Sequence, residues 1–353
     1  MYGESPGGWC IGRIDEIREV FIMKTLSKVL SAAAAMTVLA VAAGCGQAPA
    51  DNSASSGEKT YKIGVLQYAD HPSLDNCYKG FEEGLKAEGI QYEMTAQSAK
   101  NDDATNTQIA QNFAADKMDL VCGIATPSAQ ALYTACAEKN IPVVFNAVSD
   151  PVAAKLAKSE TEALDGITGV SDKLPVEAQL KLIREIMPDA SKIGILYTTS
   201  EANSVSTIET YKEKAGDFGF EIVEKGITNA ADIAAAADVL VQDVDCITNM
   251  TDNTVVANLP TLLEKATAKN IPVFGSEEEQ VTNGCVASAG IDYVELGKKA
   301  GVIAAKVLKG TDIATIPYET MTESKVTINN AAAEKIGLEI PESVTARAEV
   351  TGE

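Results

Sequence analysis

Short apolar runs alternate with longer amphipathic segments along most of the chain after residue 60. The first run, residues 63–66, has the pattern of a buried strand, and residues 74–85 follow it with apolar side chains at helical spacing. A polar loop, residues 67–73, joins the two segments. In open parallel α/β sheets, ligands bind in the loops at the carboxyl ends of the strands, so we expect the function to lie there.

This alternation continues as two series of strands and helices, separated by a Gly-rich joint at residues 166–169. We expect the strands of the first series at residues 63–66, 91–96, 118–124 and 141–145, and those of the second at 192–197, 220–225, 246–250 and 271–274. Parallel strands need crossover connections of this kind, so both series predict parallel sheets and an α/β fold class.

Two short sequences occur once in each series and in the same order. KIGVL at residues 62–66 resembles KIGIL at 192–196, and KNIPV occurs at both 139–143 and 269–273. Chance agreement between buried strands of similar composition is one explanation. Two matches in the same order instead favour two duplicate-like lobes, in which equivalent elements open and close each series.

The first part of the chain has the pattern of an export signal. Residues 29–43 are apolar but too short to span a bilayer comfortably, and two lysines precede them. The sequence AAGC at residues 42–45 resembles a bacterial lipobox, with Ala where the pattern usually has Leu. An ordinary signal peptide followed by a cysteine is the alternative.

We therefore expect residues 1–44 to be an upstream extension and lipoprotein signal peptide, with translation starting at Met23. After cleavage, Cys45 would carry the lipid. Residues 45–60 are rich in small and polar residues and would form a lipid-anchored flexible tether.

The charge balance limits the possible partners. The chain has 29 Lys and Arg against 50 Asp and Glu, a formal net charge of −21. Such an acidic protein is not expected to bind nucleic acid, or to adsorb to anionic lipid without an anchor. The seven cysteines include no C-x-x-C pair, so we expect buried thiols and no metal site.

Catalytic motifs are absent from the sequence. His71 is the only histidine, and neither a nucleophile nor an orienting acid lies at a recognisable spacing from it. Neither the G-x-x-x-x-G-K-[ST] nor the G-x-G-x-x-G nucleotide motif occurs. We therefore expect a protein that is not an enzyme and needs no cofactor.

Six short motifs occur in order at loop positions. They are HPSLD at 71–75, ATPSAQ at 125–130, SDP at 149–151, GVSD at 169–172, SEANS at 200–204 and DNT at 252–254. Together they resemble a group of bacterial solute-binding lipoproteins of ABC importers, members of which bind aromatic amino acids such as tryptophan and phenylalanine. The resemblance covers nearly all of residues 61–340.

The resemblance implies a type I periplasmic-binding-protein fold, with two Rossmann-like lobes joined by a three-strand hinge. The crossings would lie near residues 151–165, 279–285 and 312–322. The N-terminal lobe would comprise 61–150 plus 285–315, and the C-terminal lobe 151–284 plus 316–350. The ligand would lie in a cleft that closes by hinge motion.

The resemblance also implies partners and a location. The protein would be a monomer, lipid-anchored outside the bacterial cell membrane, that delivers a small-molecule ligand to an ABC permease with a cytoplasmic ATPase. A sensor subunit for a membrane kinase or chemoreceptor, and a receptor for a branched-chain amino acid or another small molecule, remain alternatives. The signal segment disfavours a cytoplasmic repressor of similar shape.

A free amino acid needs three kinds of contact. Hydroxyls at a helix N-terminus, such as those of Thr126 and Ser128, suit its carboxylate, although simple N-capping is the alternative use of these residues. For its ammonium, Asp252 is the first choice, with Asp150 and Glu277 as rivals. We rank tyrosine behind tryptophan and phenylalanine, because its phenol would need a buried partner.

The candidate ligand contacts share a position in the loops after strands or in the first turn of the helix that follows. They are Gln67, Tyr68, His71, Ser73, Leu74, Thr126, Pro127, Ser128, Asn146, Ser149, Asp150, Tyr197, Thr199, Ser200, Asn203, Ser204, Asp252, Asn253 and Glu277.

Overall fold

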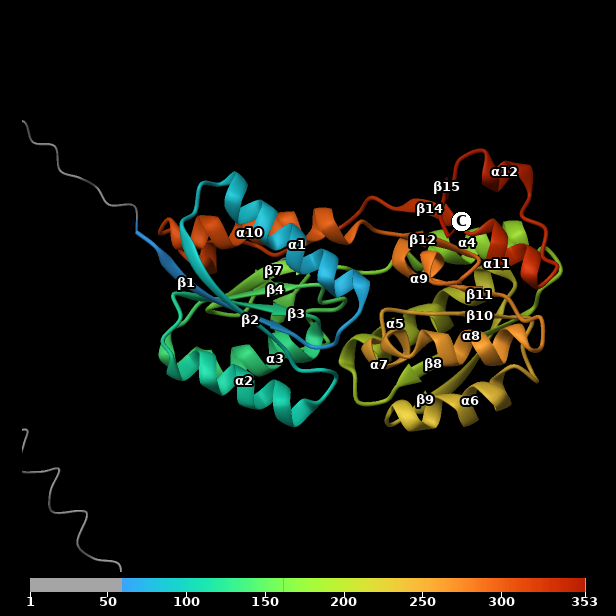
Figure 1. The fold of residues 1–353 in the computed structure, drawn as a ribbon, viewed down its shortest axis with the longest axis horizontal. Coiled ribbons are helices and arrows are strands. Elements are labelled where there is room, and N and C mark those ends of the chain that lie inside the picture. The colour runs from blue at the N-terminus through green and yellow to red at the C-terminus, as the bar shows by residue number, and fades with distance from the viewer. Residues whose placement is uncertain (1–58, 161, 353) are drawn as a thin grey trace, which may run out of the picture. The chain divides into compact units, whose positions relative to one another are not determined.

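The structure is a computed structural model that describes residues 59–160 and 162–352 (Figure 1). The expected signal peptide, the lipidation site Cys45 and all but the last two residues of the expected tether lie outside the described residues. Within the described ranges, no helix is both long enough and apolar enough to cross a membrane.

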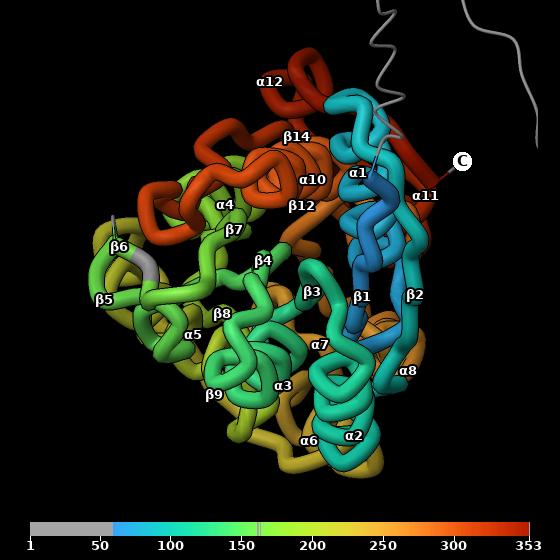
Figure 2. Tube along the Cα trace, turned by 90° about the vertical axis from the view of Figure 1, so that its left-hand side faces the viewer, coloured from blue at the N-terminus to red at the C-terminus, as the bar shows by residue number. Residues whose placement is uncertain are grey.

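The first lobe is built on a six-stranded sheet with the order β13-β7-β4-β3-β1-β2. Its strands are β1 (Tyr61–Gln67), β2 (Tyr92–Ser98), β3 (Leu120–Ile124), β4 (Val143–Asn146), β7 (Ile167–Ser171) and β13 (Glu319–Thr320), all paired in parallel. Helices α1 (Pro72–Ala87) and α10 (Tyr293–Leu308) cover one face, and α2 (Asp103–Ala115) and α3 (Thr126–Cys136) cover the other (Figures 1 and 2). A short hairpin, β5 (Ala157–Ser159) and β6 (Glu162–Ala163), precedes β7.

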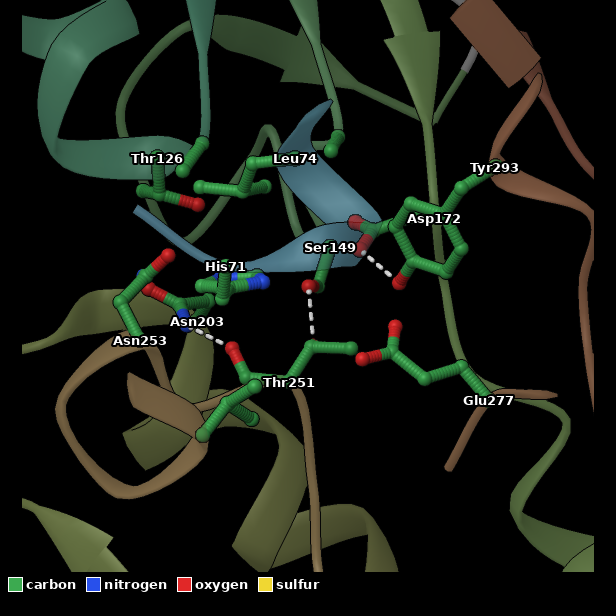
Figure 3. Close-up of a pocket in the computed structure, with 13 residues that line it drawn as sticks. His71, Leu74, Thr126, Ser149, Asp172, Asn203, Thr251, Asn253, Glu277 and Tyr293 are labelled. Atoms are coloured by element: carbon green, nitrogen blue, oxygen red, sulfur yellow. Dashed lines mark hydrogen bonds between the residues drawn. The ribbon is translucent and has the colours of Figure 1, made fainter. Parts of the chain in front are cut away.

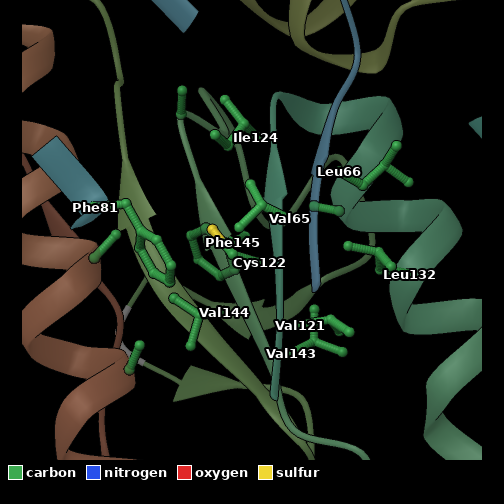
Figure 4. Close-up of a cluster of buried hydrophobic side chains, with 14 of the residues drawn as sticks. Val65, Leu66, Phe81, Val121, Cys122, Ile124, Leu132, Val143, Val144 and Phe145 are labelled. Atoms are coloured by element: carbon green, nitrogen blue, oxygen red, sulfur yellow. The ribbon is translucent and has the colours of Figure 1, made fainter. Parts of the chain in front are cut away.

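Apolar side chains fill the space on both faces of this sheet. Leu66 of β1 lies on the side of Leu132 of α3, whereas Phe81 of α1 lies on the opposite side (Figure 4). All three are fully buried.

The second lobe is built on a four-stranded parallel sheet with the order β11-β10-β8-β9. Its strands are β8 (Lys192–Thr198), β9 (Glu221–Ile227), β10 (Cys246–Thr248) and β11 (Val273–Phe274). One buried cluster packs α4 (Val176–Ile186) and α5 (Ala202–Ala215) on the sheet, and another packs α6 (Ile233–Leu240) and α8 (Leu259–Thr267). Two short helices, α7 (Asn253–Ala257) and α9 (Glu278–Thr282), follow β10 and β11.

The end of the chain completes the second lobe with a small mixed sheet. Strand β14 (Lys325–Ile328) pairs antiparallel with β12 (Ala287–Gly290) and parallel with β15 (Glu349–Val350). Helices α11 (Asn330–Lys335) and α12 (Glu342–Thr345) lie between β14 and β15 in sequence.

The two lobes share one strand order, as the repeated sequences predict. Strands β1 to β4 of the first lobe occupy the same places as β8 to β11 of the second. Asn140 and Asn270, from the two copies of KNIPV, both have a left-handed backbone, with φ of 55° and 53°. Asparagine tolerates this conformation better than most residues, so the repeat preserves a turn that leads into a buried strand.

The first two crossings between the lobes lie later in the chain than expected, whereas the third overlaps the expected residues 312–322. One buried core takes apolar residues from 63–170 and 291–318, whereas the other two take residues from 174–289 and 328–344. The chain therefore crosses near residues 171–174, 290–291 and 320–325. The segment read as a Gly-rich joint is the start of strand β7, and a Cβ on Gly169 would lie only 2.0 Å from the carbonyl oxygen of Phe145. This glycine permits close strand packing and does not mark a linker.

Helices α1 and α10 cross in unusually close contact. A Cβ on Gly80 would lie 2.1 Å from the carbonyl oxygen of Val294, and one on Gly301 would lie 2.4 Å from that of Phe81. Because only glycine allows this approach, the crossing determines where the first turns of both helices lie. Those turns carry side chains of the candidate site described next.

Candidate functional site

A small cavity lies between the two lobes (Figure 3). It is reached by loops from the carboxyl ends of strands in both sheets, together with the first turns of α1, α3 and α10. Its lining residues are His71, Leu74, Ala125, Thr126, Ala147, Ser149, Asp172, Asn203, Thr251, Asn253, Val256, Glu277 and Tyr293.

Two alanines turn the backbone sharply at the cavity. Ala125 follows β3 with φ 77°, and Ala147 follows β4 with φ 58°, conformations that L-residues rarely adopt. The turn at Ala125 leads directly into α3, and no side-chain hydrogen bond from Ala125 caps that helix. The N-terminus of α3 therefore begins at the cavity wall, where its dipole favours an anion.

One side of the cavity is acidic. Asp172, Tyr293 and Glu277 lie together there, and the Tyr293 hydroxyl donates a hydrogen bond of 2.8 Å to Asp172 Oδ2 (Figure 3). Ser73 and Gln280 donate to Glu277 Oε1. The other carboxylate oxygens, Asp172 Oδ1 and Glu277 Oε2, are buried and have no hydrogen-bond partner among the described residues.

Burial makes these two carboxyl groups unusual. Burial raises the pKa of Asp172, and burial together with the negative charge of Glu279 raises the pKa of Glu277 to about 8. Both shifts arise because a carboxylate is costly to remove from water without a cation. This side of the cavity therefore favours a positively charged group.

The opposite side offers neutral polar groups. Thr126 Oγ1, His71 Nδ1 and Asn203 Oδ1 are buried, and no described residue forms a hydrogen bond with any of them. Burial lowers the pKa of His71 to about 4, although Asn253 acts in the opposite direction. Its imidazole is therefore neutral at neutral pH, with one ring nitrogen available at the cavity.

Direct hydrogen bonds join the lobes around the cavity. Asn76 donates to Glu279 Oε1 at 2.5 Å, and Asn101 donates to Thr254 Oγ1 at 3.1 Å. Further bonds join Ser149 to Thr251, Ser73 to Glu277 and Ser206 to Asp150. These bonds hold the lobes in contact, so the structure represents a closed cleft.

The structure brings seven of the expected contacts together at this cavity. They are His71, Leu74, Thr126, Ser149, Asn203, Asn253 and Glu277. Ser73 and Asp150 lie at its edge, in hydrogen bonds between the lobes. Helix α1 begins at Pro72, with His71 in the N-cap position, so Ser73 lies within the first turn.

A second, larger hollow lies between α2, α3 and the loop after β8. Tyr68, Pro127 and Ser200 line it rather than the first cavity. Its buried acid, Glu201, accepts hydrogen bonds from Asn253 and from other donors of the second lobe. Tyr68, Pro127 and Ser200 therefore lie outside the first cavity, contrary to expectation.

Asp252 does not reach the cavity, contrary to its expected role as partner of an ammonium. Its carboxylate accepts hydrogen bonds from the amide and hydroxyl of Thr198, from Ser204 and from the amide of Val255. These four bonds use its acceptor sites and cap α7, so the side chain stabilises its own loop.

Other expected contacts also lie among residues of their own lobes. Ser128 donates to Asn106, Asn146 to the carbonyl of Cys77, and Thr199 to the carbonyl of Ile227. Ser204 donates a hydrogen bond to Asp252, and Gln67 donates one to Asp75 at the surface. Tyr197 packs against the buried cluster that contains α4 and α5.

The sequence interpretation missed six lining residues, which are Ala125, Ala147, Asp172, Thr251, Val256 and Tyr293. Asp172 follows β7, so reading residues 166–169 as a joint hid its position at a strand end. Tyr293 enters from α10, after the chain has returned to the first lobe. The GVSD motif that ends at Asp172 was the one available signal.

The family model for ABC transporter substrate binding proteins matches residues 62–351. A tyrosine-binding protein of Clostridioides difficile is 37% identical over 315 residues, which cover 87% of this chain and 90% of that protein.

Solved structures are similar over most of the described part. A Streptococcus pneumonia ABC domain in complex with L-Trp has 35% identity and a TM-score of 0.80, covering 83% of this chain and 100% of that one. The ligand-free, open structure of a Clostridium difficile substrate-binding protein with adhesive properties has 36% identity and a TM-score of 0.64, covering 83% and 99%.

The difference between these two scores agrees with a closed cleft. Identity and coverage are nearly equal, yet the arrangement here is closer to the L-Trp complex than to the open structure. The shared architecture confirms the expected type I periplasmic-binding-protein fold. Proteins of this kind capture a solute outside the cytoplasm and are not enzymes. This chain belongs to the family of ABC transporter substrate-binding proteins.

Proposed function

We propose that this protein captures an aromatic L-amino acid in the cavity between its lobes and delivers it to an ABC permease driven by a cytoplasmic ATPase. The names of two relatives support the ligand class, since one is a tyrosine-binding protein and the other was solved with L-Trp. The closed arrangement supports delivery, because hinge closure sequesters the solute.

The acidic side of the cavity is the observation that carries the proposal. Asp172 and Glu277 each present a buried carboxylate oxygen without a partner in the described structure. An ammonium group removed from water needs such anionic acceptors, and its hydrogen bonds to carboxylates are among the stronger ones in proteins. We therefore assign the α-ammonium to this side, with Glu277 and Asp172 in place of Asp252.

The carboxylate of the ligand fits the side formed by the start of α3. The hydroxyl of Thr126 is an available donor there, and the uncapped N-terminus of α3 adds its dipole. Ser149 lies between the two sides (Figure 3). A ligand bound this way spans the cavity from Glu277 to Thr126.

Apolar and aromatic groups complete the lining. Leu74, Val256 and the ring of Tyr293 offer surface for an aromatic side chain. His71 Nδ1 offers a buried hydrogen-bond partner for a phenol or an indole N–H. The reason for ranking tyrosine behind tryptophan and phenylalanine was the lack of such a partner, so we now propose all three as ligands.

Direct binding tests this proposal. The described fold lies within residues 59–352, and a protein of residues 46–353 lacks Trp9, the sole tryptophan. Added tryptophan should then show a shifted, partly polarised emission that saturates at one equivalent. Phenylalanine and tyrosine should displace it, whereas leucine, glutamate and ribose should not. Equal displacement by leucine would indicate a branched-chain receptor, and displacement by ribose alone a sugar receptor.

We also propose that Cys45 carries a lipid anchor and that the protein acts as a monomer. A Cys45→Ser change should release the protein from the membrane fraction, because acyl chains supply the anchoring free energy. Unchanged fractionation would remove the support for lipidation. Amino-terminal sequencing of the precursor would test the proposed start at Met23.

A further inference from the structure

Closing the cleft removes Glu277 from water. This residue follows β11 in the second lobe, and Ser73 of the first lobe donates a hydrogen bond to it. Its side chain is 1% exposed, and Oε2 has no partner in the described part of the chain. In the closed cleft the carboxyl group is therefore out of contact with solvent, with one oxygen still directed at the cavity (Figure 3).

The groups that act on Glu277 are acidic or uncharged. Asp172 follows β7, and Glu279 and Cys285 belong to α9 and the turn after it. Tyr293 belongs to α10 and Cys77 to α1. Glu278 and Asp292 act in turn on Glu279.

Among the described residues, Lys325 is a lysine that contacts α9, and its charge is already paired. Lys325 forms ion pairs with Glu278 at 2.7 Å and with Glu349 at 3.0 Å, outside the cavity. Burial and the charge of Glu279 accordingly raise the pKa of Glu277 to about 8. An ionised Glu277 in the closed cleft thus lacks a counter-charge from the groups that surround it.

Building on the proposed function, we propose that the closed cleft requires one positive charge at Glu277, supplied either by the ammonium of the ligand or by a proton. With an amino acid, R–NH₃⁺ meets the carboxylate and no proton is exchanged with solvent at this group. With an amine-free acid, the carboxylate takes one proton from solvent and becomes a neutral carboxyl group. Glu277 is therefore the residue that distinguishes amino acids from their deaminated analogues.

This exchange has a definite pH dependence. For the open cleft, where water reaches the carboxyl group, we take the ordinary glutamate pKa of 4.5. Between that value and about 8, a cleft closed without an ammonium holds one more proton at Glu277 than the open cleft does. Affinity for an amine-free ligand should therefore rise as the pH falls through this range.

His71 also changes its protonation on closure, but it does so for both ligand types. Its pKa in the closed cleft is lower than its ordinary value, so closure releases a proton at acidic pH. The ratio of two affinities, one for an amino acid and one for its deaminated analogue, cancels this contribution. The ratio therefore isolates Glu277.

The experiment measures phenylalanine and 3-phenylpropionate binding by calorimetry from pH 8.5 to 6.0, on residues 46–353. The preference for phenylalanine should fall about tenfold per pH unit below pH 8. In Glu277→Gln the preference should be weaker at pH 8 and independent of pH. Glu278→Gln, which changes the neighbouring residue paired with Lys325, should keep the pH dependence of the unmodified protein.

A second measurement does not depend on any variant. At pH 7, calorimetry in buffers of different ionisation enthalpy should show that 3-phenylpropionate binding takes up about one proton more than phenylalanine binding. Equal proton uptake, or a pH-independent preference, would overturn the inference while phenylalanine binding still supported the proposed function. A pH dependence kept in Glu277→Gln but lost in Asp172→Asn would overturn the assignment to Glu277. Failure of phenylalanine, tyrosine and tryptophan to bind at any pH would reject the proposed function itself.

Discussion

Ser73 of α1 donates a hydrogen bond to Glu277 of the opposite lobe, although the two residues lie 204 positions apart in the sequence. The bond joins a helix start in the first sheet's layer to a strand end of the second sheet. Closure thus buries the carboxyl group and at the same time brings it a hydroxyl donor. Contacts of this kind make the site a property of both lobes together.

The Thr126 hydroxyl is expected to serve the ligand rather than the fold. It is 1% exposed and has no partner among the described residues, so Thr126→Ala removes no hydrogen bond that the structure records. A hydrogen bond to a charged group contributes about 1.5–3 kcal/mol, so affinity should fall roughly 10- to 100-fold. Calorimetry measures this change, and thermal unfolding without ligand should change much less.

Thr126→Ser is the matched control, because it keeps the hydroxyl and should keep most of the affinity. A Thr126→Ala protein with unchanged affinity and lowered stability would instead assign the hydroxyl to the N-terminus of α3.

The same substitution should affect ligand affinity at one buried aspartate and protein stability at another. Asp172→Asn should weaken binding of an aromatic amino acid by about tenfold or more, because it removes a carboxylate proposed to meet the ammonium. Asp252→Asn should instead lower the free energy of unfolding by about 1–3 kcal/mol, because Asp252 accepts four hydrogen bonds within its lobe.

Chemical denaturation and calorimetry on both variants separate the two roles. A larger loss of affinity in Asp252→Asn than in Asp172→Asn would restore the sequence-based assignment of the ammonium partner.

Acid should open the cleft through His71. Burial lowers its pKa from 6.5 to about 4 in the closed structure, so the open or unfolded chain binds the proton more readily. The free energy that neutral His71 contributes to closure is fully present above about pH 6.5 and is lost as the pH falls toward 4. Affinity for phenylalanine should therefore decrease by up to about tenfold per pH unit between pH 6 and 5.

The replacement His71→Gln lacks a titrating group and should show a flatter profile over this range. An unmodified protein whose affinity is constant from pH 7 to 5 would contradict a buried neutral imidazole at the site.

The close crossing of α1 and α10 predicts a substitution that acts from a distance. An alanine at Gly80 would place its Cβ 2.1 Å from the carbonyl oxygen of Val294, so the helices must separate. Overpacking of this kind costs about 1–3 kcal/mol of stability. Because Leu74 and Tyr293 lie in the first turns of these helices, ligand affinity should fall as well.

Gly216→Ala is the control for this prediction. Gly216 has φ −60°, and a Cβ there would meet nothing within 4 Å, so the substitution should leave stability equal or slightly higher. Equal thermal stability of Gly80→Ala and Gly216→Ala would contradict the close crossing.

Local patterns in the sequence predict most of the fold because each strand and helix carries its own periodicity. The apolar runs beginning at residues 63 and 193 are strands β1 and β8, as expected. Strand β7 was not predicted from the sequence, because its glycine, Gly169, is required by a close contact with Phe145 of another strand. A pattern confined to one segment does not reveal a close approach between two segments.

The site was predicted less completely, for a related reason. Asp252 and Glu277 both follow strands in the second lobe, so position along the chain ranks them equally. What separates them is that the loop of Asp252 uses its carboxylate, whereas Glu277 keeps one oxygen directed at the cavity. That distinction depends on donors from Thr198 and Ser73, which lie far away in sequence.

The buried cysteines have a consequence for the biogenesis of an exported protein. Cys77, Cys122, Cys136, Cys246 and Cys285 are all buried and free, which confirms the expectation of buried thiols within the described residues. Burial raises the pKa of Cys136 to about 11 and that of Cys122 still further, which suppresses the reactive thiolate. A newly translocated chain exposes all five thiols until its lobes form. Rapid folding, rather than any disulfide among these five, is then what protects the protein from oxidative cross-linking outside the cytoplasm.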